Sequence, residues 1–579
     1  MTIRGATEAW LIYAVETAYR YENATAKQLH DAVDARISKA LATGHEALRT
    51  ESVQDYQKYF NRTSLNLGDS GATGQQNITK RLADWKGNNN ITHIQDPELM
   101  ILQFNYGKYL LIQASRPGTL PATLQGIWNR DYQPPWDSKF TLNINLEMNY
   151  WLAQPLDLRE IAEPVIDFLD KLSATGKKVA SGMYGVEDGR AWCCHHNTDI
   201  TGDCTPYHHL TIAAPYPLGG AWISFEAIEY FRFTGDLTFA RERALPILTG
   251  VMDFIYGWAT RREAGDEDEN GQGQEQGQGS WITNPSCSPE NSYVIPAGMN
   301  MSVEGDTTGL DAGAMNDRAI MHEVMSGYLE IAQALNLNLT EGGANINRAR
   351  EFRDSIWAPQ TGSYGQLLEY SREYEENDPG HRHFSPLVGV QPGSWISPLT
   401  TPEYADAAYK LLRHRMDSGS GGTSWSVVWA SLLHSRLFDA PHALEYSMLL
   451  LSRWVYNNLF SRNGGYFQLD GNSGFTASIV EMFLQSHAAG VVHLGPSIPP
   501  SGMGLSSGSF RGWVARGGFK IDMRWEDGAV VEADVKSLLG KPLNLRVGNG
   551  TDFKIDGVGY SGNAIIPTVT GQTMHIISM

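Results

Sequence analysis

Three polar segments, far apart in the chain and each set among aromatic residues, have side chains suited to acid–base chemistry. They are Thr141–Trp151 (TLNINLEMNYW), Asn284–Asn291 (NPSCSPEN) and Gln468–Gly474 (QLDGNSG). Breaking a glycosidic bond needs a carboxylic acid that protonates the leaving oxygen. It also needs a second group, on the opposite face of the sugar, that activates water or attacks the sugar. Glu290 and Asp470 are the candidates for these two roles.

Neither carboxyl group is assigned by its local sequence alone. Glu290 follows Pro289 in a stiffened loop, and the nearby Trp281 and Tyr293 would partly desolvate its carboxyl and raise its pKa, as a general acid requires. A glutamate in a loop is, however, usually just solvated. Asp470 lies in LDGNSG, which by itself is typical of a tight turn.

Two asparagines have a spacing that suits the same site. Asn143 and Asn145 are two residues apart, which places their side chains on the same side of a strand or extended loop. A carboxylate and a water molecule would satisfy both amides, and this is the environment that an attacking water needs. The alternative is that the amides only tie down a loop before a helix that starts near Glu147, and spacing leaves both interpretations open.

Composition excludes several classes of partner. The 579 residues exceed one ordinary core and predict two or three domains. Hydrophobic residues at 42% and charged residues at 19% indicate a folded globular protein. A net charge of −19 argues against nucleic acid or an anionic membrane as a partner, because both require basic patches. The first residues, MTIRGATEAW, lack the pattern of a signal peptide, and no apolar run is long enough to cross a bilayer.

The cysteines and histidines give no metal-binding pattern. The cysteines are Cys193, Cys194, Cys204 and Cys287. Their spacing fits neither a zinc site nor a disulfide framework, and one bridge between Cys194 and Cys204 stays open. We interpret His195, His196 and Asp199 as a hydrogen-bonding cluster in a polar pocket rather than as metal ligands.

The chain changes character along its length. Residues 1–90 begin with a β-like segment (LIYAVETAYRY) and continue with a helical one, and residues 91–495 are expected to form successive helices. The helices predicted from apolar periodicity include Pro97–Ser115, Gly219–Thr234, Arg243–Trp258, Asp317–Leu335, Pro402–Met416, Ser424–Leu437, Pro441–Phe460 and Phe475–Ser486. About a dozen helices without a short repeat favour a toroid of paired helices, whose loops would converge on one pocket. The insert Gly265–Gly279 predicts a mobile surface loop. Alternating segments in residues 496–579 predict a small β domain.

Several long motifs resemble those of glycoside hydrolase family 95, in the same order and over nearly the whole chain. They are Arg116–Asn129 (RPGTLPATLQGIWN), Pro134–Trp151 (PPWDSKFTLNINLEMNYW), His195–Asp203 (HHNTDITGD), NPSCSPEN, His381–Leu387 (HRHFSPL) and Phe467–His487 (FQLDGNSGFTASIVEMFLQSH). The resemblance implies an (α/α)6 barrel that follows an amino-terminal β-sandwich and helical linker and precedes a small β domain. Only a remnant of the sandwich and linker is expected in residues 1–90, so the chain resembles a shortened family member.

The resemblance also implies a role for each candidate residue. Glu290 matches the general acid, and Asp470 matches the carboxylate that activates water together with Asn143 and Asn145. The implied reaction is inverting hydrolysis, for which the two carboxyl groups would be roughly 6.5 to 9.5 Å apart. No metal or organic cofactor is implied.

Four further residues match sugar-contacting positions of the family. They are His195, His196, Arg382 and His383. The alternative for these side chains is structural hydrogen bonding at the mouth of the barrel.

Four positions depart from the family's pattern. Thr141, itself expected to contact the sugar, stands where a histidine is usual, and threonine there is associated with tolerance of L-galactose. Thr201 replaces a tryptophan, Pro386 a histidine and Ser473 a phenylalanine. Each of these changes would reshape the pocket.

The resemblance predicts an inverting exo-α-L-fucosidase that releases terminal, α-1,2-linked L-fucose from xyloglucan or related oligosaccharides and polysaccharides. The alternatives are an α-L-galactosidase, suggested by Thr141, and a non-catalytic sugar-binding remnant. An extracellular location is expected for the family. Seven N-x-S/T sequences, the first at Asn23, would then be glycosylation acceptors.

Overall fold

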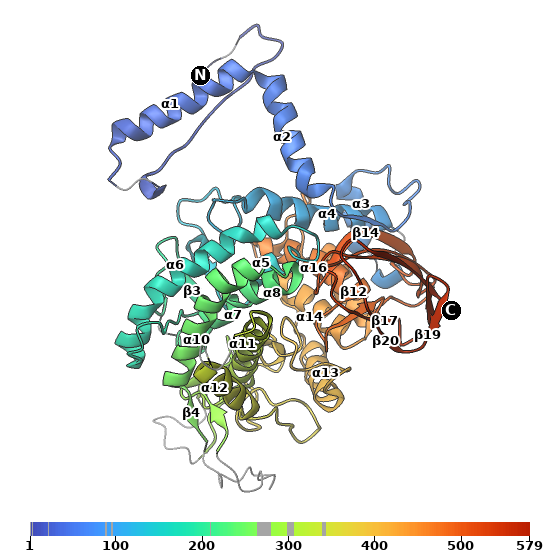
Figure 1. Cartoon of the computed structure of the whole chain (residues 1–579). Coiled ribbons are helices and arrows are strands. Elements are labelled where there is room, and N and C mark those ends of the chain that lie inside the picture. Colours follow the sequence, from blue (N-terminus) through green and yellow to red (C-terminus); the bar gives the residue numbers. More distant parts are fainter. Residues whose placement is uncertain are drawn as a thin grey trace. The chain divides into compact units, whose positions relative to one another are not determined.

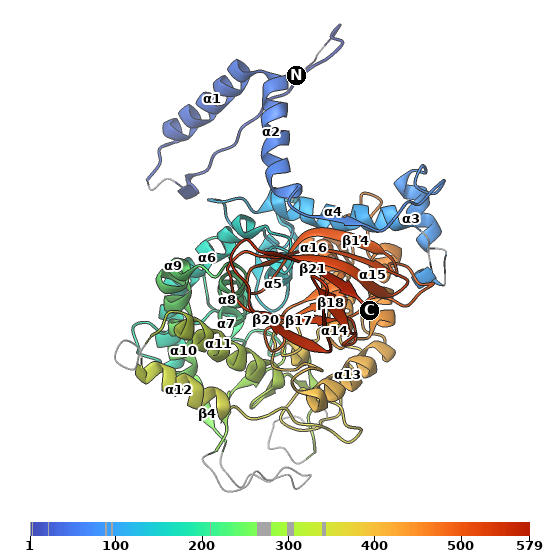
Figure 2. The same cartoon turned by 45° about the vertical axis from the view of Figure 1, so that its right-hand side comes forward.

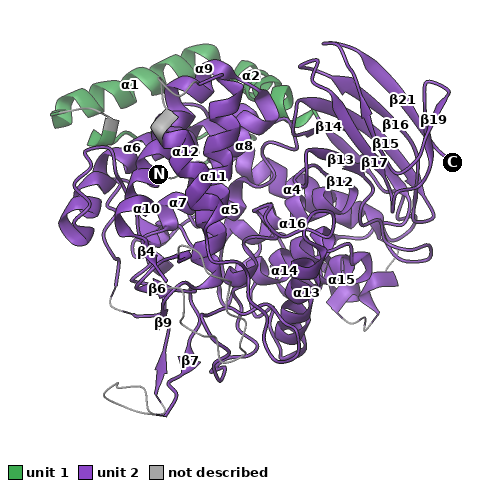
Figure 3. Cartoon of the chain, turned by 60° about the horizontal axis from the view of Figure 1, so that its bottom comes forward, with its two compact units in different colours: residues 1–62 green, residues 63–579 purple. Residues whose placement is uncertain are grey.

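The computed structural model describes residues 2, 4–20, 23–86, 88, 90–93, 96–208, 210–262, 279–297, 306–337 and 343–579. The chain divides into two compact units, Met1–Arg62 and Thr63–Met579 (Figure 3). The loop expected at Gly265–Gly279 lies, apart from Gly279, outside the described residues.

The first unit is built from two helices, α1 (Ala26–Thr43) and α2 (His45–Phe60), after a short 3-10 turn at Ala18–Arg20. Thr25 begins α1 with a capping box, in which its hydroxyl accepts from the Gln28 backbone N–H while the Gln28 side chain accepts from the Thr25 N–H. The β-like segment Leu11–Tyr21 does not form a strand in its described residues, which is a correction to the sequence prediction. A strand needs the hydrogen bonds of a neighbouring strand, and none of the strands that the structure describes pairs with this segment.

The second unit contains the predicted succession of helices. They are α3 (Ile78–Lys86), η2 (Ile91–His93), α4 (Pro97–Ala114), η3 (Pro135–Ser138), α5 (Asn145–Tyr150), α6 (Arg159–Tyr184), α7 (Gly219–Ile223), α8 (Phe225–Thr234), α9 (Leu237–Phe239), η4 (Ala240–Ala244), α10 (Leu245–Trp258), α11 (Met315–Ala334), α12 (Gly343–Asp354), η5 (Ser385–Leu387), α13 (Pro402–Asp417), α14 (Ser424–Arg436), α15 (Ala440–Arg453) and α16 (Leu469–Phe483).

These helices form two layers. Helices α5, α14 and α16 are buried along nearly their whole length, whereas α6 and α13 bury only one face. In Figures 1 and 2, α14 and α16 lie nearer the centre of this unit, and α6, α12 and α13 lie toward its periphery. An inner and an outer layer of helices are the arrangement of an (α/α)6 toroid, so the predicted fold class is confirmed. No described helix has the length and apolar character that a membrane crossing requires.

The strands are concentrated toward the carboxyl end of the chain. They are β1 (Ser64–Asn66), β2 (Phe140–Thr141), β3 (Asn197–Thr198), β4 (Thr260–Arg261), β5 (Trp281–Ile282), β6 (Ser286–Cys287), β7 (Tyr293–Val294), β8 (Thr307–Thr308), β9 (Leu310–Asp311), β10 (Arg462–Asn463), β11 (Tyr466–Phe467), β12 (Leu484–Gln485), β13 (Val491–Leu494), β14 (Gly508–Ala515), β15 (Phe519–Glu526), β16 (Ala529–Ser537), β17 (Leu543–Val547), β18 (Phe553–Ile555), β19 (Val558–Tyr560), β20 (Asn563–Ile566) and β21 (Thr573–Ser578).

Two sheets make up the carboxy-terminal β domain. One has the strand order β1-β14-β15-β16-β21-β18-β19 and the other β12-β13-β17-β20, and Figure 3 shows them side by side. Strand β1 precedes the barrel in sequence, and β12 follows directly on α16. Each sheet therefore includes at least one strand that lies outside residues 496–579. Trp513 stacks on Phe104 of α4, and Trp525 stacks on Phe483 of α16. The β domain and the barrel are therefore packed together through aromatic side chains.

The start of α16 is fixed by its neighbours. The segment LDGNSG, which by itself predicts a turn, is the first part of this helix, because the turn-forming amide of Asn472 is occupied elsewhere. Its Nδ2 donates to the Leu459 carbonyl at 2.8 Å, and its Oδ1 accepts from the Ser461 N–H and hydroxyl at 2.8 Å each. Asp470 therefore stands on the first turn of a buried helix rather than in a solvated turn.

Candidate active site

The asparagine segment is positioned by a short β ladder. Strand β2 pairs with β3, and beyond the ladder the Leu142 N–H donates to the His196 carbonyl at 2.6 Å. Asn143 lies in the turn that follows, and Asn145 is the first residue of α5. The two amides thus arise from a turn and a helix start, not from a continuous extended segment.

Each asparagine holds a different carboxylate. Asn143 Nδ2 donates to Glu290 Oε1 at 3.0 Å, and Asn145 Nδ2 donates to Asp470 Oδ2 at 2.5 Å. The partners are 147 and 325 residues away along the chain. Amides two residues apart thereby bring both candidate carboxyl groups next to one short segment. Asn143 Oδ1 remains buried without a protein partner and is available to a water molecule or a sugar hydroxyl.

The two carboxyl groups differ in exposure. The Asp470 side chain is fully buried, while that of Glu290 is 24% exposed. Burial raises the pKa of Asp470 to about 7, although the Asn145 amide and the Gly471 N–H donate to it and favour the carboxylate. Asp470 is therefore suited to act as a base near neutral pH, and Glu290 faces the solvent side, where a leaving group would depart.

Glu290 is also contacted by the segment that contains Arg382 and His383. Arg382 Nη2 donates to Glu290 Oε2 at 2.6 Å, and His383 Nε2 lies 3.6 Å from the same oxygen. Burial and the charge of Arg382 hold the pKa of His383 well below its usual value, so this imidazole is neutral. Arg382 is the more exposed of the two, with 40% of its side chain accessible.

The histidine pair is divided between two environments. His195 Nδ1 donates to the Cys204 carbonyl at 2.7 Å, which leaves Nε2 to accept from the Tyr184 hydroxyl at 2.8 Å. Both ring nitrogens of His195 are thus used within the protein. His196 is buried with its Nδ1 unpartnered, and burial lowers its pKa to about 3. Thr141 lies opposite Asn197 in the ladder and accepts from the Asn197 amide at 3.3 Å.

Comparison with known proteins places this site in a family. A sequence profile of the glycosyl hydrolase family 95 catalytic domain matches residues 44–483, and that of the family's C-terminal domain matches residues 485–574. The chain belongs to glycoside hydrolase family 95. The resemblance found from the motifs is therefore confirmed.

Curated relatives of this family 95 chain are fucosidases by name. It is 32% identical over 508 residues to "Alpha-L-fucosidase 2" of Arabidopsis thaliana, covering 86% of this chain and 56% of that protein. It is 27% identical over 558 residues to "Probable alpha-fucosidase A" of Aspergillus niger, covering 91% of this chain and 65% of the relative. The chain thus spans less than two thirds of the length of these relatives.

A solved structure shares the fold at low sequence identity. It is described as a putative kojibiose phosphorylase from the human microbiome, with a TM-score of 0.56 and 11% identity, covering 95% of this chain and 73% of that one. This likeness supports the architecture alone.

The remaining departures from the family 95 pattern have different surroundings. Thr201 is exposed, and its N–H and hydroxyl bind Asp199 in a local turn. Pro386 is buried within η5, next to the Arg382–His383 segment. Ser473 is fully buried in α16 with its hydroxyl unpartnered, as expected where a small polar side chain replaces a ring.

Several buried residues that support the site carry no sequence signal. Asp317 accepts from the Thr283 and Ser286 hydroxyls at 2.7 Å each, and burial raises its pKa to about 6. Glu369 accepts from Ser288 and Asn291, on either side of Glu290, and Arg415 donates to the His383 carbonyl. Glu369 lies in the acidic stretch LLEYSREYEEN, which gives no indication of a buried carboxylate.

Possible metal ligands gather elsewhere in the described part of the chain. All four cysteines are buried thiols without a disulfide, which answers the question left open for Cys194 and Cys204. His434, Asp439 and His442 bring their ligand atoms within 4.8 Å. Asp439 caps the amino terminus of α15, where the helix dipole disfavours a cation, and its Oδ2 accepts from both histidines. We interpret this group as a helix cap.

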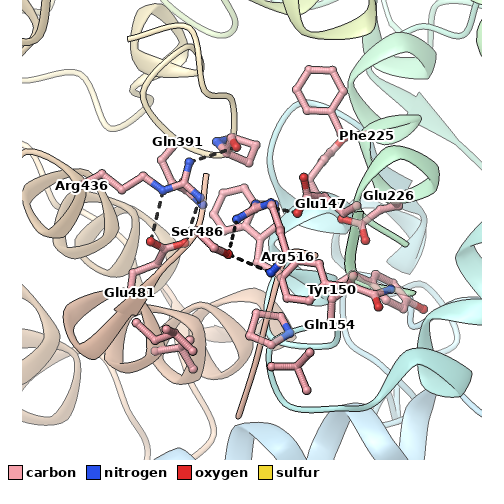
Figure 4. A pocket seen from close by; sticks show the side chains of 18 of the residues that line it. Glu147, Tyr150, Gln154, Phe225, Glu226, Gln391, Arg436, Glu481, Ser486 and Arg516 are labelled. Carbon is pink, nitrogen blue, oxygen red and sulfur yellow. Dashed lines mark hydrogen bonds and ion pairs between the residues drawn. The ribbon is translucent and has the colours of Figure 1, made fainter. Parts of the chain in front are cut away.

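A separate cavity of about 60 Å³ lies at the far end of the inner helices (Figure 4). Its wall includes Glu147, Glu226 and Glu481, and Glu481 is eleven residues along α16 from Asp470, roughly 16 Å away. The cavity is far smaller than the roughly 300 to 1,000 Å³ of ordinary small-molecule sites. Ordered water can bind its unpartnered groups, which include both oxygens of Glu147.

Proposed function

We propose that this chain is an inverting, exo-acting α-L-fucosidase. The observation that carries the proposal is the pairing of two carboxyl groups with two amides, Asn143 with Glu290 and Asn145 with Asp470. The names of the relatives and the family membership support the choice of L-fucose.

In the proposed reaction, Glu290 donates its proton to the glycosidic oxygen as the bond from that oxygen to C1 of the fucose breaks. A water molecule held by Asp470 and the two amides attacks C1 from the opposite face, and Asp470 takes its proton. The products are β-L-fucose and the free acceptor sugar. Buried amides suit this role because they orient the water without competing for its proton.

The substrate we propose is a terminal, α-1,2-linked L-fucose on xyloglucan or a related glycan. The test is fucose release from oligosaccharides that differ only in linkage, by the unmodified protein and its Glu290→Gln and Asp470→Asn variants. We expect the 1,2-linked substrate to be preferred. Each variant should lose about 10² to 10⁴-fold in kcat while remaining folded. Equal activity in the variants would refute the assignment of both carboxyl groups.

Thr141 favours a second candidate, an α-L-galactosidase. L-Galactose carries a hydroxyl at C6 where L-fucose has only hydrogen, and the half-buried Thr141 is shorter than the histidine usual at this position. The test is the ratio of kcat/KM for matched α-L-galactosides and α-L-fucosides. Thr141→His should lower the relative rate on the galactoside by about tenfold. If kcat/KM of the unmodified protein is higher for the galactoside than for the fucoside, α-L-galactosidase is the principal activity. Binding of either sugar without turnover would instead indicate a non-catalytic protein.

A further inference from the structure

We propose that the buried Glu369–Arg415 pair is the positioning element for Glu290. The pair fixes the loop that contains Glu290 against the segment that contains Arg382 and His383. This inference rests on the proposed function, in which Glu290 is the general acid.

The carboxylate of Glu369 is the first component of this positioning element. The Ser288 hydroxyl donates to its Oε1 at 2.7 Å, and the Asn291 amide donates to its Oε2 at 2.8 Å. Ser288 and Asn291 flank the Pro289–Glu290 pair, and the Asn291 N–H also closes the turn on the Ser288 carbonyl at 2.9 Å. One carboxylate therefore binds both ends of the four-residue turn from which the Glu290 side chain projects.

The guanidinium of Arg415, in the last turn of α13, is the second component. It is 1% exposed, and it donates to Glu369 Oε2 through Nη2 and to the His383 carbonyl at 2.8 Å through Nη1. A single planar group thus joins the Glu290 turn to the segment whose side chains contact the Glu290 carboxylate. The Ser385 hydroxyl makes a second connection by donating to the Pro289 carbonyl.

Stability alone does not explain such a pair. Two charges taken out of water pay a desolvation penalty that their attraction often fails to recover, and well-packed apolar residues of similar size are frequently as stable. Fixed geometry is a better explanation at a general acid, because a misplacement of about 1 Å can reduce the rate by about 10²-fold. The side-chain hydrogen bonds described for Glu369 and Arg415 join the two residues to each other and to the segments that contain Glu290 and His383. We therefore assign the pair a positioning role rather than a catalytic one.

The leaving group distinguishes positioning of the acid from general destabilisation. A sugar leaving group must receive a proton from Glu290 as its bond to C1 breaks. Fluoride departs from α-L-fucosyl fluoride as a stable anion without that proton, while the water attacks C1 and gives its proton to Asp470 as before. A displaced acid therefore slows release of the sugar and spares release of fluoride.

The experiment compares kcat and KM for 2′-fucosyllactose and α-L-fucosyl fluoride. The variants are Glu369→Gln and the milder Ser288→Ala, with Glu290→Gln as the reference for complete loss of the acid. Ser431→Ala is the matched control, because Ser431 is a fully buried serine like Ser288. Its hydroxyl hydrogen-bonds with Ala443 and Ser447 of α15, away from the turn that contains Glu290. Folding of each variant is checked by circular dichroism.

We expect Glu369→Gln and Ser288→Ala to lower kcat for 2′-fucosyllactose by about 10 to 100-fold with little change in KM. Turnover of the fluoride should stay within about threefold, and Ser431→Ala should leave the ratio of the two rates unchanged. Equal losses on both substrates, or a wild-type ratio in Ser288→Ala, would overturn the inference. If Glu369→Gln fails to fold, Ser288→Ala decides. Failure of the unmodified protein to hydrolyse either compound would refute the proposed function instead.

Discussion

The two carboxyl groups of the site are chemically unequal because their surroundings are unequal. Asp470 is enclosed on the first turn of α16, and its contacts include an amide and a backbone N–H. Glu290 is partly open to solvent and shares its oxygens between Asn143 and Arg382. Glycoside hydrolysis needs two carboxyl groups whose surroundings differ, so that one can act as an acid and the other as a base.

The first prediction concerns the acid side of the pH profile. Burial raises the pKa of Asp470 from 3.8 to about 7, and a general base acts in its deprotonated form. The acid limb of the log kcat/KM profile should therefore rise with pH up to about 7. Asn145 donates to Asp470 and favours the carboxylate, so Asn145→Ala should move this limb to higher pH.

Asn143→Ala provides the control, because Asn143 binds Glu290 and not Asp470. This variant should lower the rate without moving the acid limb of the pH profile. A limb that stays in place in Asn145→Ala, or one that lies below pH 5 in the unmodified protein, would contradict the role of Asp470.

The candidate residues could be selected from the sequence because their motifs are long. Which amide binds which carboxylate could not be predicted. The two-residue spacing of Asn143 and Asn145 indicated one shared environment, whereas each amide binds its own carboxylate. The roles of Glu369 and Arg415 could not be predicted, because their burial and hydrogen bonds depend on residues 32 to 81 positions away along the chain. A short polar motif does not determine such contacts.

At the scale of elements, the contact between α4 and α16 determines the position of Asp470. Gly107 of α4 faces α16, and a Cβ there would lie 2.3 Å from the Asn472 carbonyl oxygen and from the Thr476 hydroxyl. Thr476 donates to the Phe104 carbonyl at 2.9 Å across the same contact. The absence of a side chain at Gly107 is therefore what lets the two helices touch.

The second prediction follows from this contact. Gly107→Ala should destabilise the protein by about 1 to 3 kcal/mol, because backbone of α16 must move to admit the methyl group. It should also lower kcat by displacing Asp470. Gly182→Ala is the matched control, as Gly182 is an exposed glycine within α6 with no atom within 4 Å of the added Cβ. It should be stabilising by roughly 0.5 to 1 kcal/mol. Thermal unfolding and turnover measured together would test both, and an unaffected Gly107→Ala would disprove the argument.

Helix positions were largely predictable, and the failures have local causes. The apolar periodicity placed α4, α11, α13 and α14 to within two residues, but it extended α15 to Phe460, whereas the helix ends at Arg453. The segment after it turns back, and Val455 pairs with Ser461 in an isolated bridge. Helix α6 was missed because Pro164 and Gly176 interrupt its pattern. Pro164 is early in the helix, and Gly176 closely approaches the Cys193 carbonyl.

At the scale of the whole molecule, the barrel and the β domain meet around the small cavity of Figure 4. Arg516, from the turn after β14, pairs with Glu229 of α8, and Arg436 forms a two-point pair with Glu481. Glu226 lies in the same wall. Burial and the charge of Glu229 raise the pKa of Glu226 to about 8, so this carboxyl is protonated in the folded protein at neutral pH.

The third prediction is a pH-dependent stability effect at Glu226. Between an unfolded-state pKa near 4.5 and a folded-state pKa of about 8, the folded protein binds a proton that the unfolded chain releases. Stability therefore falls as pH rises through this window. Glu226→Gln removes that cost, so the variant should match wild type near pH 4 and exceed it by about 2 to 4 kcal/mol at pH 8.

Denaturant unfolding at several pH values measures the difference. Glu403→Gln, at an exposed position at the start of α13, is the control for the loss of a carboxylate at the surface. If the unfolding free energies of Glu226→Gln and wild type differ by the same amount at every pH, the proposed protonation of Glu226 is wrong.

The most direct test of the central claim is proton NMR of the sugar released from 2′-fucosyllactose by the unmodified protein and by Asp470→Asn. We expect β-L-fucose to appear first and to mutarotate afterwards, and we expect the folded Asp470→Asn variant to release almost none. Initial release of α-L-fucose, or unchanged release by Asp470→Asn, would contradict inverting hydrolysis through Asp470.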